Sequence, residues 1–175
     1  MGLRAKMRIR QAKPGDGEMV ARVHRAAFGR ETEGRLAELL GAAGKQTVSL
    51  VAEIEAQVVG HVMFSRVVVE RAAAEIRVMG LAPLAVLPEF QRRGIGMGLV
   101  GEGLAVCGRM GVHAVVVLGN PHYYSRFGFM RASGHGLKNE YGADEDFMVV
   151  ELRPGTLARI GGMVRYGEEF REVGC

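Results

Sequence analysis

The feature that most constrains the fold is a strand, helix and strand in the middle of the chain. Residues 79–87 form an apolar stretch closed by Pro88, residues 94–110 have the periodicity of a helix, and residues 112–118 are a continuous apolar run. A fully apolar strand is typical of one buried on both faces, and two strands joined through a helix pair in parallel. The pattern predicts a βαβ unit.

The segments around this unit predict antiparallel strands. Residues 47–55 and 58–70 are rich in Val and Ile and are separated by a polar break, which indicates a hairpin. Further strands are expected at residues 8–11, 129–131 and 147–152, with helices from Pro14 through Phe28 and over 31–40, a short helix around Tyr124, and a Gly-rich loop over 134–142. We therefore predict an α/β (α+β) fold whose mixed, mostly antiparallel sheet splays at its parallel pair and is flanked by helices.

Size and composition fit one globular domain. A chain of 175 residues with 48% hydrophobic and 24% charged residues is ordinary for such a domain. We expect residues 1–175 to form a single domain, with a tail beyond about residue 154 whose secondary structure the sequence pattern determines poorly. Residues 1–7 lack the apolar stretch of a secretory signal, and no stretch reaches the roughly 18 apolar residues of a membrane span, so a cytoplasmic protein without membrane contact is expected.

Charge and cysteine content narrow the choice of partners. The net charge of +4 favours anionic ligands, but the basic residues are scattered along the chain, so we expect no nucleic-acid partner. A polyphosphate-bearing cofactor would use the same excess of charge. Cys107 and Cys175 do not make a disulfide framework or a metal site, and both are expected to be inert thiols.

The most informative motif is Gln91-Arg92-Arg93-Gly94-Ile95-Gly96, between the strand that ends before Pro88 and the long helix. A helix start carries unpaired N–H groups and about half a positive charge, so small residues there let a diphosphate approach the backbone. Arg92 and Arg93 add cationic donors. An isolated Gly-x-Gly also serves ordinary tight turns, so the motif gains its weight from the residues around it.

The extended segment Leu84-Ala-Val-Leu-Pro-Glu-Phe-Gln-Arg-Arg-Gly-Ile-Gly resembles the signature of the GNAT acetyltransferase superfamily, whose loop consensus is Gln/Arg-x-x-Gly-x-Gly/Ala. The resemblance implies that backbone groups at Leu84, Ala85 and Val86 pair with the pantetheine arm of acetyl-CoA. It also implies that the loop holds the pyrophosphate through Arg92, Arg93, Gly94, Ile95, Gly96 and Met97.

The same stretch contains a competing motif, because Gly96, Gly98 and Gly101 satisfy the dinucleotide fingerprint Gly-x-Gly-x-x-Gly. That fingerprint follows its strand directly and has an acidic residue about 20 positions later. Here residues 88–93 intervene, and the next strand ends without an acid. We interpret Gly98, Gly101 and Gly103 as positions where the helix packs close to the sheet.

A second segment, Gly119-Asn-Pro-His-Tyr-Tyr-Ser-Arg-Phe-Gly-Phe129, is similar to the later motif of the YhbS-like branch of the family, and the resemblance extends from Arg8 to Gly155. It implies that Tyr124 is the acid for the thiolate that leaves a thioester, with packing as the alternative role for a buried tyrosine. Asn120 and Arg126 are candidate coenzyme ligands. Many family members have an Asn seven residues before the Tyr, where this chain has Val117.

No general base can be assigned from the sequence. The candidates are Glu53, His61, Glu75, His122 and Glu89, whereas His24, His113 and His135 are expected to be surface or packing residues. Substrate choice is expected in the loops over residues 28–45 and 134–146, where Asp144, Glu145 and Asp146 either attract a cationic amine or form a solvated turn.

The resemblance thus implies an acetyl-CoA-dependent N-acetyltransferase that uses no metal. Its acceptor would be the amine of a small molecule or of a protein, attacked directly in a ternary complex. A non-catalytic acyl-CoA-binding sensor of the same fold is the alternative, and a homodimer is left open.

Overall fold

The computed structural model describes residues 6–44 and 47–175, so most of the N-terminal segment considered for a secretory signal lies outside it. Two compact units are distinguished. The first comprises the described parts of Met1–Phe64 with Pro83–Gly103 and Glu168–Cys175, and the second comprises Ser65–Ala82 and Leu104–Gly167. Three elements belong in part to each unit: β3 (Gln57–Ala72), β4 (Val78–Val86) and α3 (Ile95–Arg109).

The sheet of the first unit is built on the predicted hairpin. Strand β1 (Arg8–Gln11) pairs antiparallel with β2 (Val48–Ile54), and β2 pairs antiparallel with β3. The hairpin turns at Glu55 and Ala56, whose φ angles of 49° and 64° are those of a tight two-residue turn. The end of β4 is attached to β3 by a hydrogen bond of 2.8 Å from Leu87 N to Val59 O.

The β2–β3 register contains a bulge. Near the turn, Glu53 pairs with Val58, but Ala52 pairs with Gly60 and Val51 with His61, so Val59 is an extra residue. Side chains alternate between the two faces of a strand, so one extra residue exchanges the faces of everything beyond it. The bulge thereby places the side chains of His61 and Ser49 on the same face.

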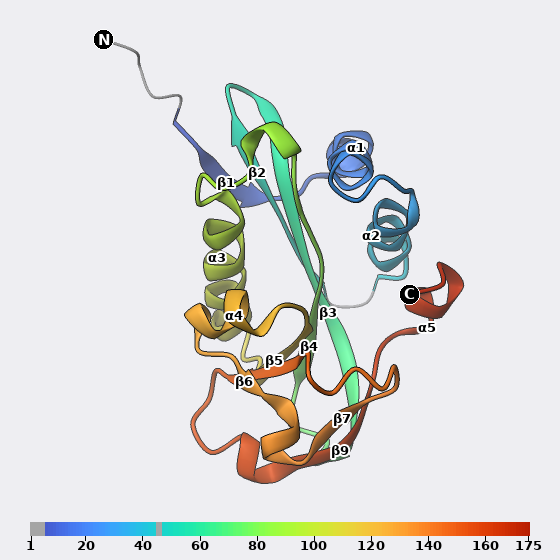
Figure 1. Ribbon diagram of the computed structural model, residues 1–175, viewed down its shortest axis with the longest axis vertical. Helices are drawn as coiled ribbons and strands as arrows, with labels where there is room; N and C mark the ends of the chain where they lie inside the picture. The colour runs from blue at the N-terminus through green and yellow to red at the C-terminus, as the bar shows by residue number, and fades with distance from the viewer. Residues whose placement is uncertain (1–5, 45–46) are drawn as a thin grey trace. The chain divides into compact units, whose positions relative to one another are not determined.

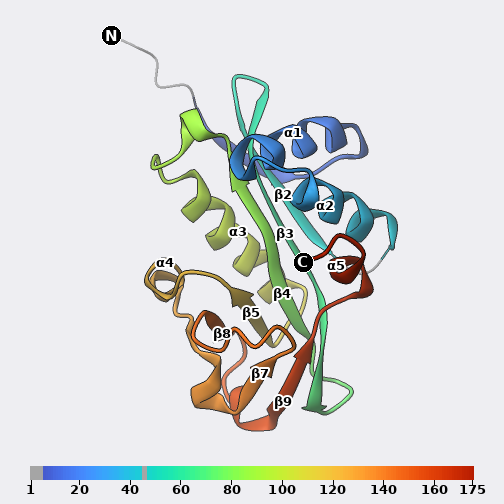
Figure 2. The same ribbon diagram turned by 45° about the vertical axis from the view of Figure 1, so that its right-hand side comes forward.

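Helices cover both faces of this sheet (Figures 1 and 2). A 3₁₀ turn (Pro14–Asp16) leads into α1 (Gly17–Phe28), which lies beside α2 (Thr32–Ala42) on one face, and α3 lies on the other. Gly34 permits the close approach of the two helices, because an added Cβ would lie 3.3 Å from Ala21 Cα. The short α5 (Glu168–Glu172) packs on α2.

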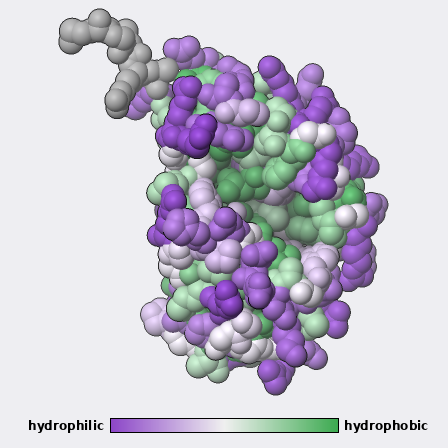
Figure 3. Space-filling view, in the orientation of Figure 1, coloured by the Kyte–Doolittle hydropathy of each residue, from purple (hydrophilic) through white to green (hydrophobic). Residues whose placement is uncertain are grey.

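The amphipathic character of α1 and α2 follows from their sequences. Apolar side chains at helical spacing, Val20 and Val23 on α1 and Leu36 and Leu40 on α2, are buried against the sheet. The outward faces carry charged residues, and the space-filling view accordingly shows polar residues along the outer surface of these helices and apolar residues toward the strands (Figure 3).

The second unit carries the parallel pair. Residues Val78, Met79 and Gly80 of β4 pair in parallel with Ala114, Val115 and Val116 of β5 (Ala114–Leu118), and this register ends there although β5 continues to Leu118. Strand β5 then pairs antiparallel with β8 (Phe147–Glu151), which pairs antiparallel with β6 (Met130–Arg131). The predicted mixed, mostly antiparallel sheet with a parallel pair and flanking helices is confirmed.

The Gly-rich loop prediction for residues 134–142 is wrong in part. A 3₁₀ turn (Ala132–His135) is followed by a strand, β7 (Leu137–Asn139), which pairs in parallel with β9 (Ile160–Arg165) of the C-terminal tail (Figure 2). The side chain of Asn139 then closes a turn, because its Oδ1 accepts from Tyr141 N at 3.0 Å and Ala143 N at 3.2 Å. A strand this short has no readable periodicity.

The glycines of α3 differ in role. An added Cβ at Gly103 would overlap the Phe64 ring, and one at Gly98 would lie 3.0 Å from Ile9 Cδ1, so both permit close packing on the sheet. Gly101 has nothing within 4 Å of that position, and its predicted packing role is wrong.

Candidate functional site

The predicted loop leads directly into α3. After a 3₁₀ turn (Pro88–Phe90), the chain takes positive φ angles at Arg92 (59°) and Gly94 (81°), and α3 begins at Ile95. Gly94 O accepts from Gly98 N at 2.9 Å, so the first turn of the helix closes on Gly94. A Cβ added at Gly94 would meet nothing within 4 Å. The loop is therefore an open turn at the start of a helix, with room beside its backbone.

The loop is cationic and is attached to the end of β4. Arg92 and Arg93 are exposed, and the guanidinium of Arg93 lies 5.4 Å from the centre of the Phe90 ring. Gln91 Nε2 donates to Val86 O at 3.0 Å. This bond joins the loop to the end of the strand that contains Leu84, Ala85 and Val86. All the predicted ligands between residues 84 and 97 belong to the first unit.

The predicted acid lies in the second unit. Strand β5 ends at Leu118, and α4 (Pro121–Tyr124) begins after Asn120, whose Oδ1 accepts from His122 N at 2.9 Å. Asn120 is thus the N-cap of this short helix. It also lines a small surface pocket with Gly119 and Asp146.

Tyr124 is held by aromatic neighbours. Its ring makes an edge contact with Tyr123 at 5.0 Å between centroids and another with Phe129 at 5.6 Å. A Cβ at position 119 would overlap this ring, which explains the glycine there. Both functions predicted for a buried tyrosine are therefore open to Tyr124, since it packs and also carries a hydroxyl.

The hydroxyl of Tyr124 is protonated at neutral pH. Burial raises the pKa of Tyr124 well above its ordinary value, and neighbouring Tyr123 raises it further. No hydrogen bond joins the hydroxyl to another residue within the described ranges. Arg126 is exposed, and its guanidinium lies 5.7 Å from the centre of the Tyr123 ring.

The candidate bases are in contrasting environments. Glu53 is paired with Arg10 at 2.9 Å, and Glu75 with Arg159 at 2.7 Å, so both carboxylates are already engaged. Glu89 and His122 are exposed. His61 is 1% exposed, and burial lowers its pKa to about 3, so the ring is neutral.

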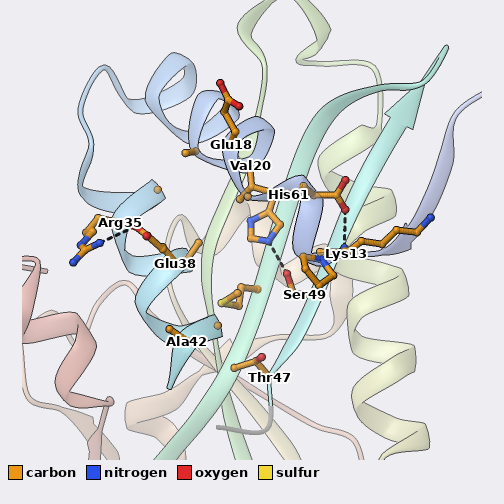
Figure 4. Close-up of a pocket in the computed structure, with 18 of the residues that line it drawn as sticks. Lys13, Glu18, Val20, Arg35, Glu38, Ala42, Thr47, Ser49 and His61 are labelled. Carbon is orange, nitrogen blue, oxygen red and sulfur yellow. Dashed lines mark hydrogen bonds and ion pairs between the residues drawn. The ribbon is translucent and has the colours of Figure 1, made fainter. Parts of the chain in front are cut away.

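The sequence did not predict that His61 belongs to a chain of hydrogen bonds. His61 Nδ1 lies 2.8 Å from His24 Nε2, and His61 Nε2 lies 2.9 Å from Ser49 Oγ. The expectation that His24 is a packing residue is confirmed in part, since it is fully buried and also joins this chain. Figure 4 shows the imidazole of His61 directed at Ser49 at the side of a pocket under α1 and α2.

The cysteines, possible metal ligands and possible membrane-spanning helices can also be compared with the sequence-based expectations. Both cysteines are free thiols in the structure. Cys107 is buried, which raises its pKa to about 12, and Cys175 is exposed. Residues 6–44 and 47–175 contain no group of three or more acidic, His or Cys side chains suited to a metal ion. No helix in the same part of the chain is long and apolar enough to cross a membrane. Of the loops expected to select the substrate, Lys45 lies outside the described residues.

The mixed sheet, its parallel pair and the glycine loop ahead of α3 together define the fold class of the GNAT acetyltransferases. The family model described as "Acetyltransferase (GNAT) domain" matches residues 8–132. The chain belongs to this family, and the resemblance drawn from residues 84–96 is confirmed.

The chain resembles one branch of the family over nearly its full length. It is 37% identical over 166 residues to the uncharacterized N-acetyltransferase YhbS of Escherichia coli K12, covering 94% of this chain and 98% of that protein. The uncharacterized N-acetyltransferase YjhQ of the same strain is 36% identical over 121 residues, or 68% of this chain and 67% of YjhQ. The predicted YhbS-like branch is therefore confirmed.

Two crystal structures extend the comparison. The structure of Escherichia coli YhbS in complex with CoA has a TM-score of 0.91 and 35% identity, and covers 98% of this chain and 95% of its own. A GNAT acetyltransferase from Brucella melitensis in complex with acetyl-CoA has a TM-score of 0.79 and 35% identity, covering 95% and 99%.

Proposed function

We propose that this protein transfers the acetyl group of acetyl-CoA to a primary amine. The observation that carries the proposal is the open, cationic turn at residues 91–97, formed by the family's signature loop ahead of α3. The relatives solved with CoA and with acetyl-CoA support the choice of co-substrate.

The loop has the properties that a diphosphate requires. The N–H groups at the start of α3 lie at the positive end of the helix dipole. The open space beside Gly94 lets phosphate oxygens approach the backbone, and exposed Arg92 and Arg93 supply charge-assisted hydrogen bonds. We propose that Leu84, Ala85 and Val86 bind the pantetheine arm through their backbone groups.

The reaction removes two protons from the amine nitrogen and supplies one to the sulfur. A primary amine with a pKa near 10.4 is mostly protonated at neutral pH and must lose a proton before attack. Its nitrogen then forms a bond to the thioester carbonyl carbon and loses a second proton as the carbon–sulfur bond breaks. The sulfur leaves as a thiolate that takes up one proton. Backbone N–H groups near Val86 would polarise the carbonyl.

Tyr124 would act at the sulfur. Its raised pKa makes the phenol a weaker acid than a thiol, whose pKa is about 8.5. Complete proton transfer to the thiolate would therefore be unfavourable, and a hydrogen bond that stabilises the developing negative charge is the contribution we assign to it. Asn120 and Arg126 remain proposed coenzyme ligands, and for Asn120 the observed capping bond supplies a structural role as well.

An amine panel tests the proposed activity. The purified protein is incubated with acetyl-CoA and with small amines, amino acids, and peptides that offer an N-terminus or a lysine, and release of the CoA thiol is followed. Thiol release that depends on one class of amine is expected. If calorimetry finds CoA bound but no amine accelerates thiol release, the protein is an acyl-CoA-binding module instead, and absence of CoA binding rejects both functions.

A further inference from the structure

A pocket of about 950 Å³ lies in the first unit, between α1 and α2 on one side and strands β2 and β3 on the other (Figure 4). Its volume falls in the range of small-molecule sites, roughly 300 to 1,000 Å³. Val20, Ala37 and Met63 give it an apolar lining. Ser49 and His61 bring polar atoms from the strands, and Thr47 brings a hydroxyl from the residue just before β2. Neither the loop at residues 91–97 nor α3 lines it, since α3 covers the opposite face of the sheet.

The polar groups of this pocket are ordered by the buried histidines behind them. His24 and His61 are 0% and 1% exposed, and the hydrogen bonds from His24 to His61 and from His61 to Ser49 are 2.8 and 2.9 Å long. Burial lowers the pKa of His24 to about 4 and that of His61 to about 3. Both rings are therefore neutral at neutral pH, and each carries a single N–H.

The ring nitrogen that carries each N–H follows from the environment of His24, the first residue of the hydrogen-bonded series. His24 Nδ1 is buried and has no hydrogen-bond partner among the described residues. An N–H at that atom would be an unsatisfied buried donor, which costs about 1 to 3 kcal/mol, whereas an unused lone pair costs less. The proton of His24 is accordingly on Nε2, and this N–H donates to His61 Nδ1.

The proton position on His24 then determines the direction of the remaining hydrogen bonds. Because His61 Nδ1 accepts, the His61 proton is on Nε2 and donates to Ser49 Oγ. The hydroxyl of Ser49 is left with its own O–H as a donor, and no second side-chain partner of Ser49 exists within the described residues. Ser49 lines the pocket and is only half-buried, so this donor is available there.

We propose that this pocket binds a small molecule with an apolar body and a carbonyl oxygen, and that Ser49 recognises the oxygen by donating a hydrogen bond. His61 and His24 are positioning residues that keep the Ser49 O–H directed outward. A carbonyl accepts such a bond, whereas an ammonium group cannot accept it and loses hydration of its charge among the apolar walls. The site is independent of acetyl transfer, and its ligand need not be a reactant.

Charges at the rim do not favour one sign of ligand. Glu38 is paired with Arg35 at 2.8 Å, and Asp16 with Arg10 at 2.7 Å. Arg25 and Glu31 form a further ion pair, and Lys13 and Glu18 add one charge of each sign. With the rim nearly balanced, the direction of the Ser49 hydroxyl and the apolar walls decide the ligand class, and a neutral amide is the simplest probe.

Nuclear magnetic resonance titration of the full chain tests the site with two probes of equal length, hexanamide and hexylammonium. Hexanamide is expected to cause saturable shifts of the amide signals of residues 47–51 and 61–63. Its affinity should fall about threefold to tenfold in Ser49→Ala, the effect of losing one hydrogen bond. Hexylammonium should bind at least severalfold more weakly than hexanamide.

Thr47→Val is the matched control, because it removes the other hydroxyl that lines the pocket while keeping the shape of the side chain. It should leave the hexanamide affinity unchanged, and dispersed spectra of both variants verify that they fold. The proposal is overturned if hexanamide causes no saturable shift at these residues, if the two variants lose equal affinity, or if hexylammonium binds as tightly as hexanamide.

Discussion

The hydroxyl of Tyr124 can be separated from its ring by one substitution. Tyr124→Phe keeps the contacts with Tyr123 and Phe129 and removes only the hydrogen bond proposed for the leaving sulfur. We expect kcat to fall about tenfold to a hundredfold, less than most general acids contribute, because Tyr124 donates a hydrogen bond and does not transfer its proton completely. The affinity for acetyl-CoA should not change.

Tyr123→Phe provides the comparison, since Tyr123 is the adjacent, half-buried tyrosine to which we assign packing alone. Steady-state rates with the best amine of the panel, together with calorimetric affinities, distinguish the two variants. Equal rates for Tyr124→Phe and the wild type would remove Tyr124 from the reaction.

The backbone at Gly94 gives a second residue-level prediction. Any side chain at φ 81° strains the backbone by about 1 to 2 kcal/mol, so Gly94→Ala combines strain with obstruction of the approach to the loop. We expect the variant to fold and to bind CoA at least about tenfold more weakly, as measured by calorimetry.

Gly142→Ala controls for the strain alone. Gly142 has a φ of 69° and, like Gly94, has nothing within 4 Å of an added Cβ. Its substitution should lower the melting temperature by a similar amount and leave CoA affinity intact. Unchanged CoA affinity in Gly94→Ala would exclude the loop from the binding site.

Within α3, the glycines predict opposite effects on stability. Gly101→Ala adds a methyl group in open space and improves helix propensity, so unfolding should become about 0.5 to 1 kcal/mol less favourable. Gly103→Ala would overlap the Phe64 ring and should destabilise by about 1 to 3 kcal/mol despite the same gain in propensity. Denaturant titration measures both free energies of unfolding, and effects of the same sign would contradict the packing of α3 on β3.

Elements with strong local patterns were predictable from the sequence. The β2–β3 hairpin, the long helix after the glycine loop and the apolar strand β5 each have a period or a turn signal of sufficient length. Strand β7 was missed because three residues in a Gly-rich segment have no readable period, and its partner β9 lies in a tail where the sequence predicted nothing.

The hydrogen-bonded series of His24, His61 and Ser49 could not be predicted from the sequence for a different reason. The three residues are far apart in the sequence, and an unbroken hairpin register would place Ser49 and His61 on opposite faces of the sheet. The bulge at Val59 brings them to one face. Gly60 is a residue type that can mark a bulge, but it equally permits the close packing of Leu99 and Ile95, so it did not identify the shift. The coenzyme loop could be predicted because its residues are contiguous.

Across the whole molecule, the buried histidines couple stability to pH. The folded state holds His24 and His61 with pKa values lowered to about 4 and about 3, mainly by burial, while the unfolded chain binds their protons near pH 6.5. Glu33 beside His24 and Asp16 beside His61 oppose these shifts without reversing them. Stability is therefore full above pH 6.5 and declines as the pH falls toward 4.

Between pH 6 and 5 the free energy of unfolding should fall with a slope approaching about 1.4 kcal/mol per pH unit for each histidine. Asp16, whose pKa Arg10 holds at about 2, contributes loss of stability only at lower pH, so this window isolates the histidines. His113 is half-buried and its pKa is also lowered, but it is less desolvated than His24 and His61, so His113→Gln should flatten the slope less than a change at His24 does. His24→Gln keeps a donor toward His61 and should flatten the slope. Urea titrations at several pH values measure the free energy of unfolding of both proteins. Equal slopes in His24→Gln and the wild type would show that the lowered pKa of His24 does not contribute to the pH dependence of stability.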